Sequence, residues 1–249
     1  MLHSSLKRMI EETGASGVPE IEIIRRAKQS GPSLGVFPSS FNPITVAHIE
    51  IIRRAAREFS LAETLALAGK ANADKADYDC PLEKRLQMLF YAFEEDDPVS
   101  IGLSSHAYFS DMLEALERVY TGHTDFYFIV GFDTFERVLD PEDRYTAKYH
   151  RRFTDRIEAL EYIFSRSHFI VAGRAGAGEN DLRALIKAES ATLADRTHFL
   201  DLPMEIAERS ATEVRSRLRE GLEVHGLVPD EVERYINRRG LYKAAARGV

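Results

Sequence analysis

Residues 34–48 read Leu-Gly-Val-Phe-Pro-Ser-Ser-Phe-Asn-Pro-Ile-Thr-Val-Ala-His, and the expected fold follows from their pattern. The first four residues are an apolar run between turn-forming residues, which predicts a buried strand. Apolar residues then recur at helical spacing over residues 46–59, which predicts a helix. A turn from a strand into a helix presents free backbone N–H groups and the positive end of the helix dipole. We therefore expect an anion, above all a phosphate, to bind at this turn.

Strands and helices alternate along the chain beyond this unit. Further strands are predicted over residues 64–68, 99–103, 126–130, 168–172 and 198–200, and further helices over residues 81–93 and 109–120. Such alternation is typical of an α/β protein with a Rossmann-like, doubly wound parallel sheet and helices on both faces. Ligands bind to these folds at the carboxyl ends of the strands.

The pattern divides the chain into three parts. Residues 1–30 are helix-permissive apart from Gly14, Gly17 and Pro19, and predict a helical extension of two short helices. Residues 31–206 hold the Rossmann-like domain. Residues 207–249 contain no strand candidate, and predict a small helical subdomain with helices over 212–220 and 229–238.

Composition limits the class of protein. The chain has 33 Lys and Arg against 40 Asp and Glu, a net charge of −7, which disfavours a nucleic-acid partner. A single cysteine, Cys80, permits no intrachain disulfide and no cysteine zinc site. No apolar leader and no run of about 20 apolar residues is found. We expect a cytoplasmic protein that does not engage a membrane.

Thr45 and His48 form the first group with possible chemistry. They lie one helical turn apart, so a hydroxyl and an imidazole can both face a phosphate bound at the turn. In the alternative interpretation, Asn42 caps the helix, Pro43 takes its first position, and His48 is an ordinary polar helix residue.

Ser210, Thr212 and Arg215 form the second group, in the sequence Ser-Ala-Thr-Glu-Val-Arg. An arginine in the first turns of a helix adds a forked phosphate donor to the positive helix end. Alternatively, Ser210 and Glu213 form a capping box, which starts a helix without any ligand.

Two strand ends carry further candidates. Gly131 and Asp133 follow the strand over 126–130, where a carboxylate can accept from a ribose hydroxyl, although Asp133 can equally cap the next helix. Arg174 follows the strand over 168–172, as a ligand group or as a solvated loop charge. No nucleophile paired with a base and no protein metal site stands out in the sequence.

Taken in order, these segments resemble the nicotinamide or nicotinate mononucleotide adenylyltransferases of the nucleotidylyltransferase superfamily. The chain has Ser-Phe-Asn-Pro-Ile-Thr-Val-Ala-His at residues 40–48, where the family has S-F-[ND]-P-x-[HT]-x-x-H. Residues 128–133 and 169–174 are similar to its strand ends. Residues 210–215 are similar to S-[ST]-T-x-[IV]-R, and are followed by Gly221, Leu-Val-Pro at 227–229 and Leu-Tyr at 241–242, as in the family.

The resemblance implies NAD biosynthesis: ATP and a pyridine mononucleotide give a dinucleotide and pyrophosphate. It assigns Thr45 and His48 to the α-phosphate of ATP, Ser210, Thr212 and Arg215 to the outer phosphates, and Gly131 and Asp133 to a ribose. It places the remaining candidates in the nucleotide site (Ser40, Phe41, Lys75 and Arg174) and in the substrate pocket (Tyr108 and Phe109).

The implied chemistry needs no general base, because the mononucleotide phosphate is already an anionic nucleophile. Mg²⁺ is expected to be held by ATP and water. The chain departs from the family at Pro38-Ser39, where two glycines are usual, at Ala211, and in having no tryptophan for the pyridine ring. Two alternatives follow: transfer to another phosphorylated acceptor, and a nucleotide-binding relative without turnover.

Overall fold

The computed structural model describes residues 2–70, 79–122, 125–140, 142–144, 152–173, 176–187 and 189–243. Its strands are β1 (Ile21–Arg25), β2 (Ser33–Ser39), β3 (Glu63–Gly69), β4 (Val99–Ser104), β5 (Asp125–Gly131), β6 (Ser167–Ala172) and β7 (Thr197–Leu200). Its longer helices are α1 (Leu2–Glu12), α2 (Val46–Glu58), α3 (Leu82–Ala92), α4 (Phe109–Val119), α5 (Phe132–Leu139), α6 (Arg156–Phe164), α7 (Glu179–Ile186), α10 (Ala211–Arg219) and α11 (Asp230–Arg239). Two short helices, α8 (Ala191–Asp195) and α9 (Met204–Ala207), complete the chain.

The strands form one sheet in the order β1-β4-β3-β2-β5-β6-β7, parallel except for β1. From β2 the chain proceeds outward through β3 and β4, and then crosses to β5, β6 and β7 on the other side. This is the doubly wound, Rossmann-like arrangement that the alternation of strands and helices predicts, and the prediction is confirmed.

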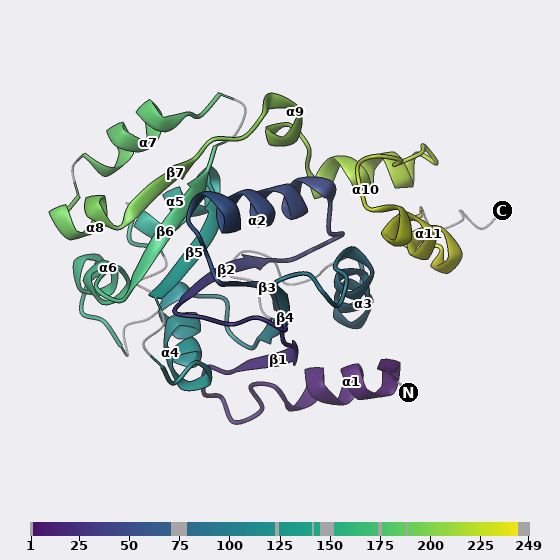
Figure 1. Cartoon of the computed structure of the whole chain (residues 1–249), viewed down its shortest axis with the longest axis horizontal. Coiled ribbons are helices and arrows are strands. Elements are labelled where there is room, and N and C mark those ends of the chain that lie inside the picture. Colours follow the sequence, from purple (N-terminus) through teal and green to yellow (C-terminus); the bar gives the residue numbers. More distant parts are fainter. Residues whose placement is uncertain are drawn as a thin grey trace.

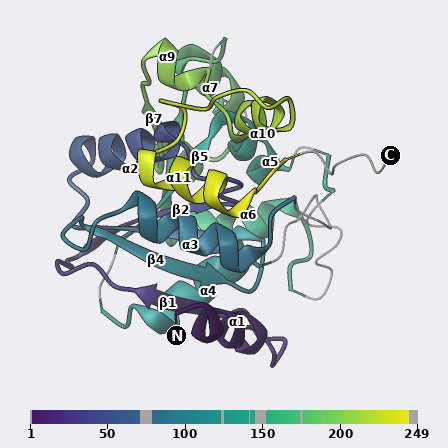
Figure 2. The same ribbon diagram turned by 90° about the vertical axis from the view of Figure 1, so that its right-hand side faces the viewer.

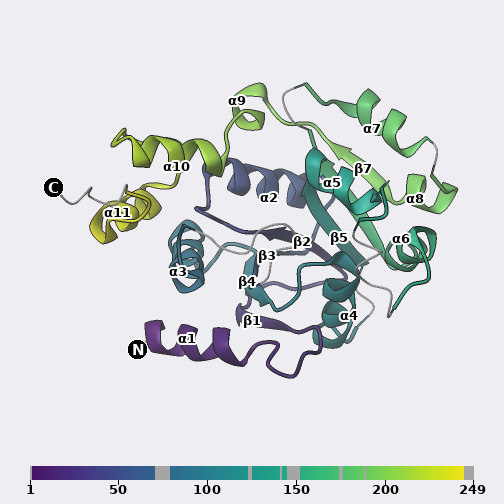
Figure 3. The ribbon, with the colours of Figure 1, turned by 180° about the vertical axis from the view of Figure 1, so that it is seen from behind.

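Helices cover both faces of the sheet (Figure 1). Buried side chains of α2, α3, α10 and α11 pack together on one face, which Figure 2 turns toward the viewer. Those of α4, α5 and α6 pack on the other, seen from behind in Figure 3. Each face has its own core, and the apolar strands that separate the cores, β3 foremost, are buried on both sides. Among the described residues, no helix has the length and apolar character needed to span a membrane.

The amino-terminal extension differs from its prediction. Residues 21–25 were expected to be helical and instead form β1, which pairs antiparallel with β4. The sequence Ile-Glu-Ile-Ile-Arg is rich in β-branched residues, which suit a pleated strand, and β4 otherwise offers an unpaired edge. The second half of the extension therefore belongs to the main sheet, and α1 is its one described helix.

Two histidines form a partly buried polar chain across β6 and β7. Arg196 Nη1 donates to His168 Nε2 at 2.9 Å, and His168 Nδ1 lies 3.1 Å from His198 Nε2. Because arginine is always a donor, His168 Nε2 accepts and its Nδ1–H donates to His198. Both rings are therefore neutral. Burial foremost, then Arg196, lowers the pKa of His198 and lowers that of His168 to about 4.

The lowered pKa values of His168 and His198 predict that the folded protein loses stability in acid. The unfolded protein binds protons at these histidines below pH ~6.5, whereas folded His168 binds one only near its pKa of about 4, so the free energy of unfolding falls as pH falls through that window. The substitution His168→Phe keeps a ring against Tyr127 but removes the titration, and should flatten the decline of the urea midpoint with pH. His225→Ala, which removes a histidine outside the hydrogen-bonded group of Arg196, His168 and His198, is the control. Parallel declines in wild type and His168→Phe would contradict the assignment.

Candidate active site

The strand order reverses between β2 and β5, and we call the space between their carboxyl ends the crevice. The two strands pair from Ser33 and Asp125 as far as Val36 and Phe128. Beyond that point β2 stays paired with β3 up to Ser39, and β5 with β6 up to Gly131, but they no longer pair with each other. The carboxyl ends of β2 and β5 thus diverge at the topological switch point, the usual ligand position in an open α/β sheet.

Thr45 and His48 meet at the start of α2, on one side of this crevice. Thr45 is the N-cap, and its hydroxyl accepts from the backbone N–H of His48 at 3.4 Å. His48 Nδ1 in turn lies 3.0 Å from the backbone nitrogen of Thr45 and 2.8 Å from its hydroxyl. The two residues form a reciprocal capping box, with histidine in the place usual for Glu or Gln. The interpretation with Asn42 as cap and Pro43 at the first position is wrong, because both precede the observed cap.

The capping box fixes the proton of His48. The Thr45 N–H can only donate, so Nδ1 accepts and the neutral ring carries its proton on Nε2. Phe37 and Phe41 pack around the ring with centroids 5.8 and 5.6 Å away. Burial lowers the pKa of His48 to about 4. His48 is therefore a neutral donor at physiological pH, and Thr45, only 1% exposed, holds the ring in place.

The second group begins α10. Ser210 is its N-cap and accepts from the backbone N–H of Glu213 at 3.1 Å, which confirms the Ser210 half of the capping-box interpretation. Arg215 is half-buried. Its Nη2 donates to the Thr212 hydroxyl at 3.1 Å, and its Nη1 donates to the backbone carbonyl of Asn42 at 2.6 Å.

The bond from Arg215 to Asn42 joins the two sequence motifs in space. The backbone N–H of Val46 also donates to the carbonyl of Leu227, at 3.0 Å, so the segment after α10 is fastened to the first turn of α2. In Figure 1 the start of α2 lies beside α10. Both helices thus bring their positive ends and their polar side chains to one end of the crevice.

The remaining candidates lie at other points of the carboxyl edge. Gly131 and Asp133 are exposed where β5 turns into α5, across the crevice from α2. Ser40 is half-buried, and Phe41 is buried under His48, so Phe41 has only its backbone to offer a ligand. These four positions flank the divergence of β2 and β5.

Tyr108 and Phe109 begin α4, after β4. The Phe109 ring packs edge-to-face on Phe128 with centroids 5.0 Å apart, and lies 5.4 Å from Phe169. Much of this ring is therefore taken up by the core of that face. Lys75 and Arg174 lie outside the described residues, so their predicted roles remain predictions.

Two residues that the sequence analysis did not single out contact the site. Arg85, only 2% exposed on α3, donates from Nη1 to the carbonyl of Ser40 at 2.5 Å. Asp79 pairs with Arg215, 3.4 Å from its Nε, and with Arg219. A signal for Arg85 exists in the sequence, because it falls on the helix face that also carries Leu82, Leu86 and Leu89. Asp79 carries no such signal.

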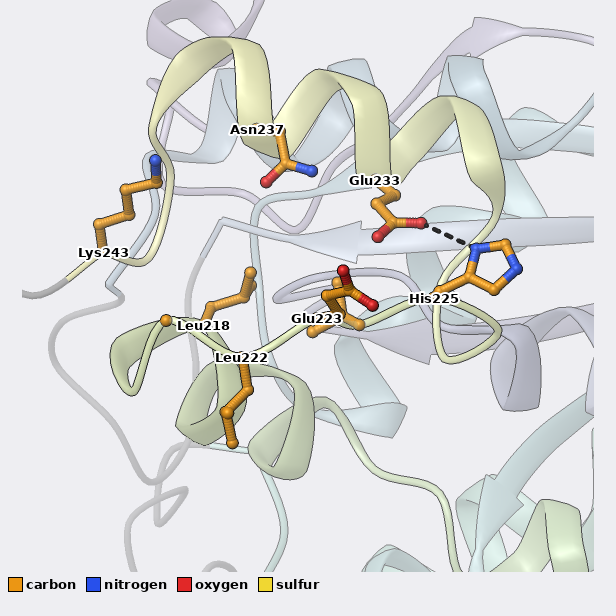
Figure 4. Close-up of a pocket in the computed structure, with 9 residues that line it drawn as sticks. Leu218, Leu222, Glu223, His225, Glu233, Asn237 and Lys243 are labelled. Carbon is orange, nitrogen blue, oxygen red and sulfur yellow. Dashed lines mark hydrogen bonds and ion pairs between the residues drawn. The ribbon is translucent and has the colours of Figure 1, made fainter.

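The described residues contain one group able to hold a metal, on the segment between α10 and α11 and the start of α11. Ligand atoms of His225, Asp230 and Glu233 lie within 4.8 Å of one another, beside a pocket of about 410 Å³ between α10 and α11 (Figure 4). Asp230 and Glu233 belong to the first turn of α11. Acidic side chains there offset the helix dipole without an ion. We therefore assign no metal to this group.

The chain is similar in sequence to curated proteins and in fold to solved structures. The curated protein named "Probable nicotinate-nucleotide adenylyltransferase" from Geobacter sulfurreducens is 28% identical over 229 residues, 84% of this chain and 97% of the relative. A protein of the same name from Desulfitobacterium hafniense is 25% identical over 218 residues, 84% of this chain and 95% of the relative. The solved nicotinic acid mononucleotide adenylyltransferase of Plasmodium falciparum, complexed with NaAD, superposes with a TM-score of 0.62 at 16% identity, over 85% of this chain and 98% of that one. This last likeness concerns the fold alone.

A sequence profile of the family described as cytidylyltransferase-like matches residues 36–217, from within β2 to within α10. The match spans both sequence motifs, at residues 40–48 and 210–215, and the carboxyl ends of β2 and β5. The chain therefore belongs to the cytidylyltransferase-like family.

Proposed function

We propose that the protein is an adenylyltransferase of NAD biosynthesis, which joins ATP to nicotinate mononucleotide, or to its amide, and releases pyrophosphate. The observation that carries the proposal is the hydrogen bond from Arg215 to the carbonyl of Asn42, because it unites the two phosphate motifs at the switch point. The names of the relatives favour the nicotinate form as acceptor.

The reaction needs positioning more than acid–base chemistry. A phosphate oxygen of the mononucleotide attacks the α-phosphorus of ATP, the bond to the bridging oxygen breaks, and pyrophosphate leaves with the electron pair. The His48 Nε2–H donates to the α-phosphate, where charge accumulates in the transition state. Arg215, with Thr212 and the first turn of α10 capped by Ser210, holds the phosphates that leave.

The other residues are assigned to the nucleosides and the polyphosphate. Gly131 and Asp133 contact a ribose at the exposed end of β5, and Tyr108 and Phe109 border the pyridine ring. Lys75 and Arg174 add charge to the polyphosphate, and Ser40 and Phe41 contribute the backbone of the turn. Each of these roles is part of the proposal.

Mg²⁺ fits the reaction as a partner of ATP. The side chains that the proposal assigns to phosphate are hydroxyls, a neutral imidazole and a guanidinium, a set that suits phosphate rather than a cation. The nearby carboxylate of Asp79 is paired with Arg215 and Arg219. We propose that the triphosphate and water supply the Mg²⁺ ligands, and that the ion neutralises charge on the phosphates.

The test is an assay of the purified protein with Mg²⁺ and each pyridine mononucleotide, with ATP as the donor. CTP is a second donor in the assay, because the family is described as cytidylyltransferase-like. Dinucleotide and pyrophosphate from ATP and nicotinate mononucleotide support the proposal. Product from the amide alone would change the acceptor. No product from either mononucleotide would reject the function and leave transfer to another acceptor, or binding without turnover.

A further inference from the structure

The loop that carries the first phosphate motif is held from its buried side by the carboxyl-terminal end of the chain. The hydroxyl of Tyr242, three residues beyond α11, donates to Asn42 Oδ1 at 2.9 Å. Tyr242 is 7% exposed and Asn42 is 5% exposed, so water does not compete freely for either group. Asn42 is thus bound twice, through its side chain by Tyr242 and through its carbonyl by Arg215.

The backbone after α11 is shaped to place this tyrosine. Gly240 ends the helix in the left-handed conformation at φ 62°, and the backbone N–H of Leu241 returns to the carbonyl of Ile236 at 3.1 Å. Tyr242 itself has φ 63°, a costly conformation for a residue with a side chain. Such a conformation persists where the surrounding contacts determine it. Here those contacts are the burial of the ring and the bond to Asn42.

The hydroxyl is a permanent donor. Burial foremost, and then the neighbouring Cys80, raises the pKa of Tyr242 well above its ordinary value, so the group stays protonated across the physiological range. A neutral donor facing an amide oxygen makes an oriented bond that does not depend on pH. The residues that follow Asn42 lead directly to Thr45 and His48, so a shift of Asn42 displaces the capping box.

We propose that Tyr242 is a positioning residue of the phosphate site, which sets the loop of residues 40–46 through Asn42 and thereby the place of His48. The inference rests on the proposed function for its catalytic readout, but its structural readout does not. Tyr242 touches no reacting atom, and acts only through the loop.

The experiment uses the full chain with Tyr242→Phe, which removes one oxygen and leaves the ring. Loss of the bond should lower kcat/KM for ATP roughly tenfold. Most of the loss should fall on kcat, with KM for the mononucleotide unchanged. Affinity for a non-hydrolysable ATP analogue should fall, and hydrogen exchange of the amides of residues 40–48 should accelerate. Tyr235→Phe, at another buried tyrosine of the same subdomain, is the matched control and should change none of these.

A double-substitution cycle separates positioning from a general loss of packing. If Tyr242 acts through Asn42, then Tyr242→Phe should cost nothing further in an Asn42→Ala background. Unchanged exchange at residues 40–48 together with unchanged affinity for the analogue would overturn the inference. A wild-type protein that transfers to neither mononucleotide would reject the proposed function, while the exchange measurement would still decide the inference.

Discussion

His48→Ala should lower kcat/KM for adenylyl transfer by roughly 30- to 1,000-fold, which corresponds to about 2 to 4 kcal/mol of transition-state stabilisation. The physical reason is the fixed Nε2–H. The Thr45 N–H occupies Nδ1, and two phenylalanine rings hold the imidazole, so the donor needs no reorganisation when charge develops on the α-phosphate. Steady-state kinetics with ATP varied at saturating mononucleotide measure the effect.

The pH profile gives an independent check on this role. With a pKa of about 4 for His48, protonation of this ring should not reduce kcat/KM near pH 6.5, and the acidic loss that belongs to His48 should begin below pH ~5. Protonation places a hydrogen on Nδ1, which can then no longer accept from Thr45.

His225→Ala, at an exposed histidine outside the crevice, should leave kcat/KM as in wild type. Unchanged kcat/KM in His48→Ala would refute the assignment.

Arg215→Ala should lower kcat/KM for ATP at least ~100-fold, because a charged hydrogen bond contributes about 1.5 to 3 kcal/mol and the guanidinium can make two to a phosphate. The outer phosphates gain negative charge as pyrophosphate leaves, so kcat should fall as well as the affinity for ATP. Arg215→Lys keeps the charge but not the fork, and should recover only part of the loss.

Arg219→Ala is the matched control for Arg215→Ala. Arg219 lies one turn later on α10 and shares Asp79 as its partner, but its side chain is half exposed. An exposed ion pair of this kind contributes little, so kcat/KM should stay within about threefold of wild type. Equal losses in both variants would mean that the charge of α10 matters and the contact with the crevice does not.

Measurements on Arg215→Ala also separate a loss of ATP binding from a loss of folding stability. Arg215 also fastens Asn42, so Arg215→Ala should lower the urea midpoint slightly, whereas the kinetic loss should persist well below the unfolding transition. If salt or an osmolyte that stabilises the folded state restored the full activity of Arg215→Ala, its low activity would result from reduced stability. We expect the activity to stay low.

Local pattern predicted most of the fold. The described residues form seven strands, and six of them were predicted. These six, and the helices α2, α3, α4, α10 and α11, follow from periodicity and caps within about ten residues. The exception is β1, whose three isoleucines within five residues are compatible with either a helix or a strand. Its partner β4 lies far along the chain, and only that partner decides the outcome.

The candidate site was predictable as two separate motifs. Each motif is a helix start, and capping chemistry is local enough to be recognised from residues three apart. The start of α2 was predicted too early in the chain, because Asn42, Pro43 and Thr45 all suit a helix start. Which of them begins the helix depends on contacts between this loop and residues from other parts of the chain. Those contacts come from Arg85, Arg215, Leu227 and Tyr242.

The α/β class, the strand-to-helix turn before α2 and the capped start of α10 were therefore predictable without the structure, because each depends on neighbours within a few turns of chain. The folded chain was needed to show that β2 and β5 lie side by side and diverge, that Arg215 reaches Asn42, and that Thr45 holds His48. These features depend on the order of strands in the sheet and on contacts between residues as far apart as Asn42 and Tyr242. Periodicity along a chain carries no information about such contacts, since each segment would keep the same pattern in a different strand order.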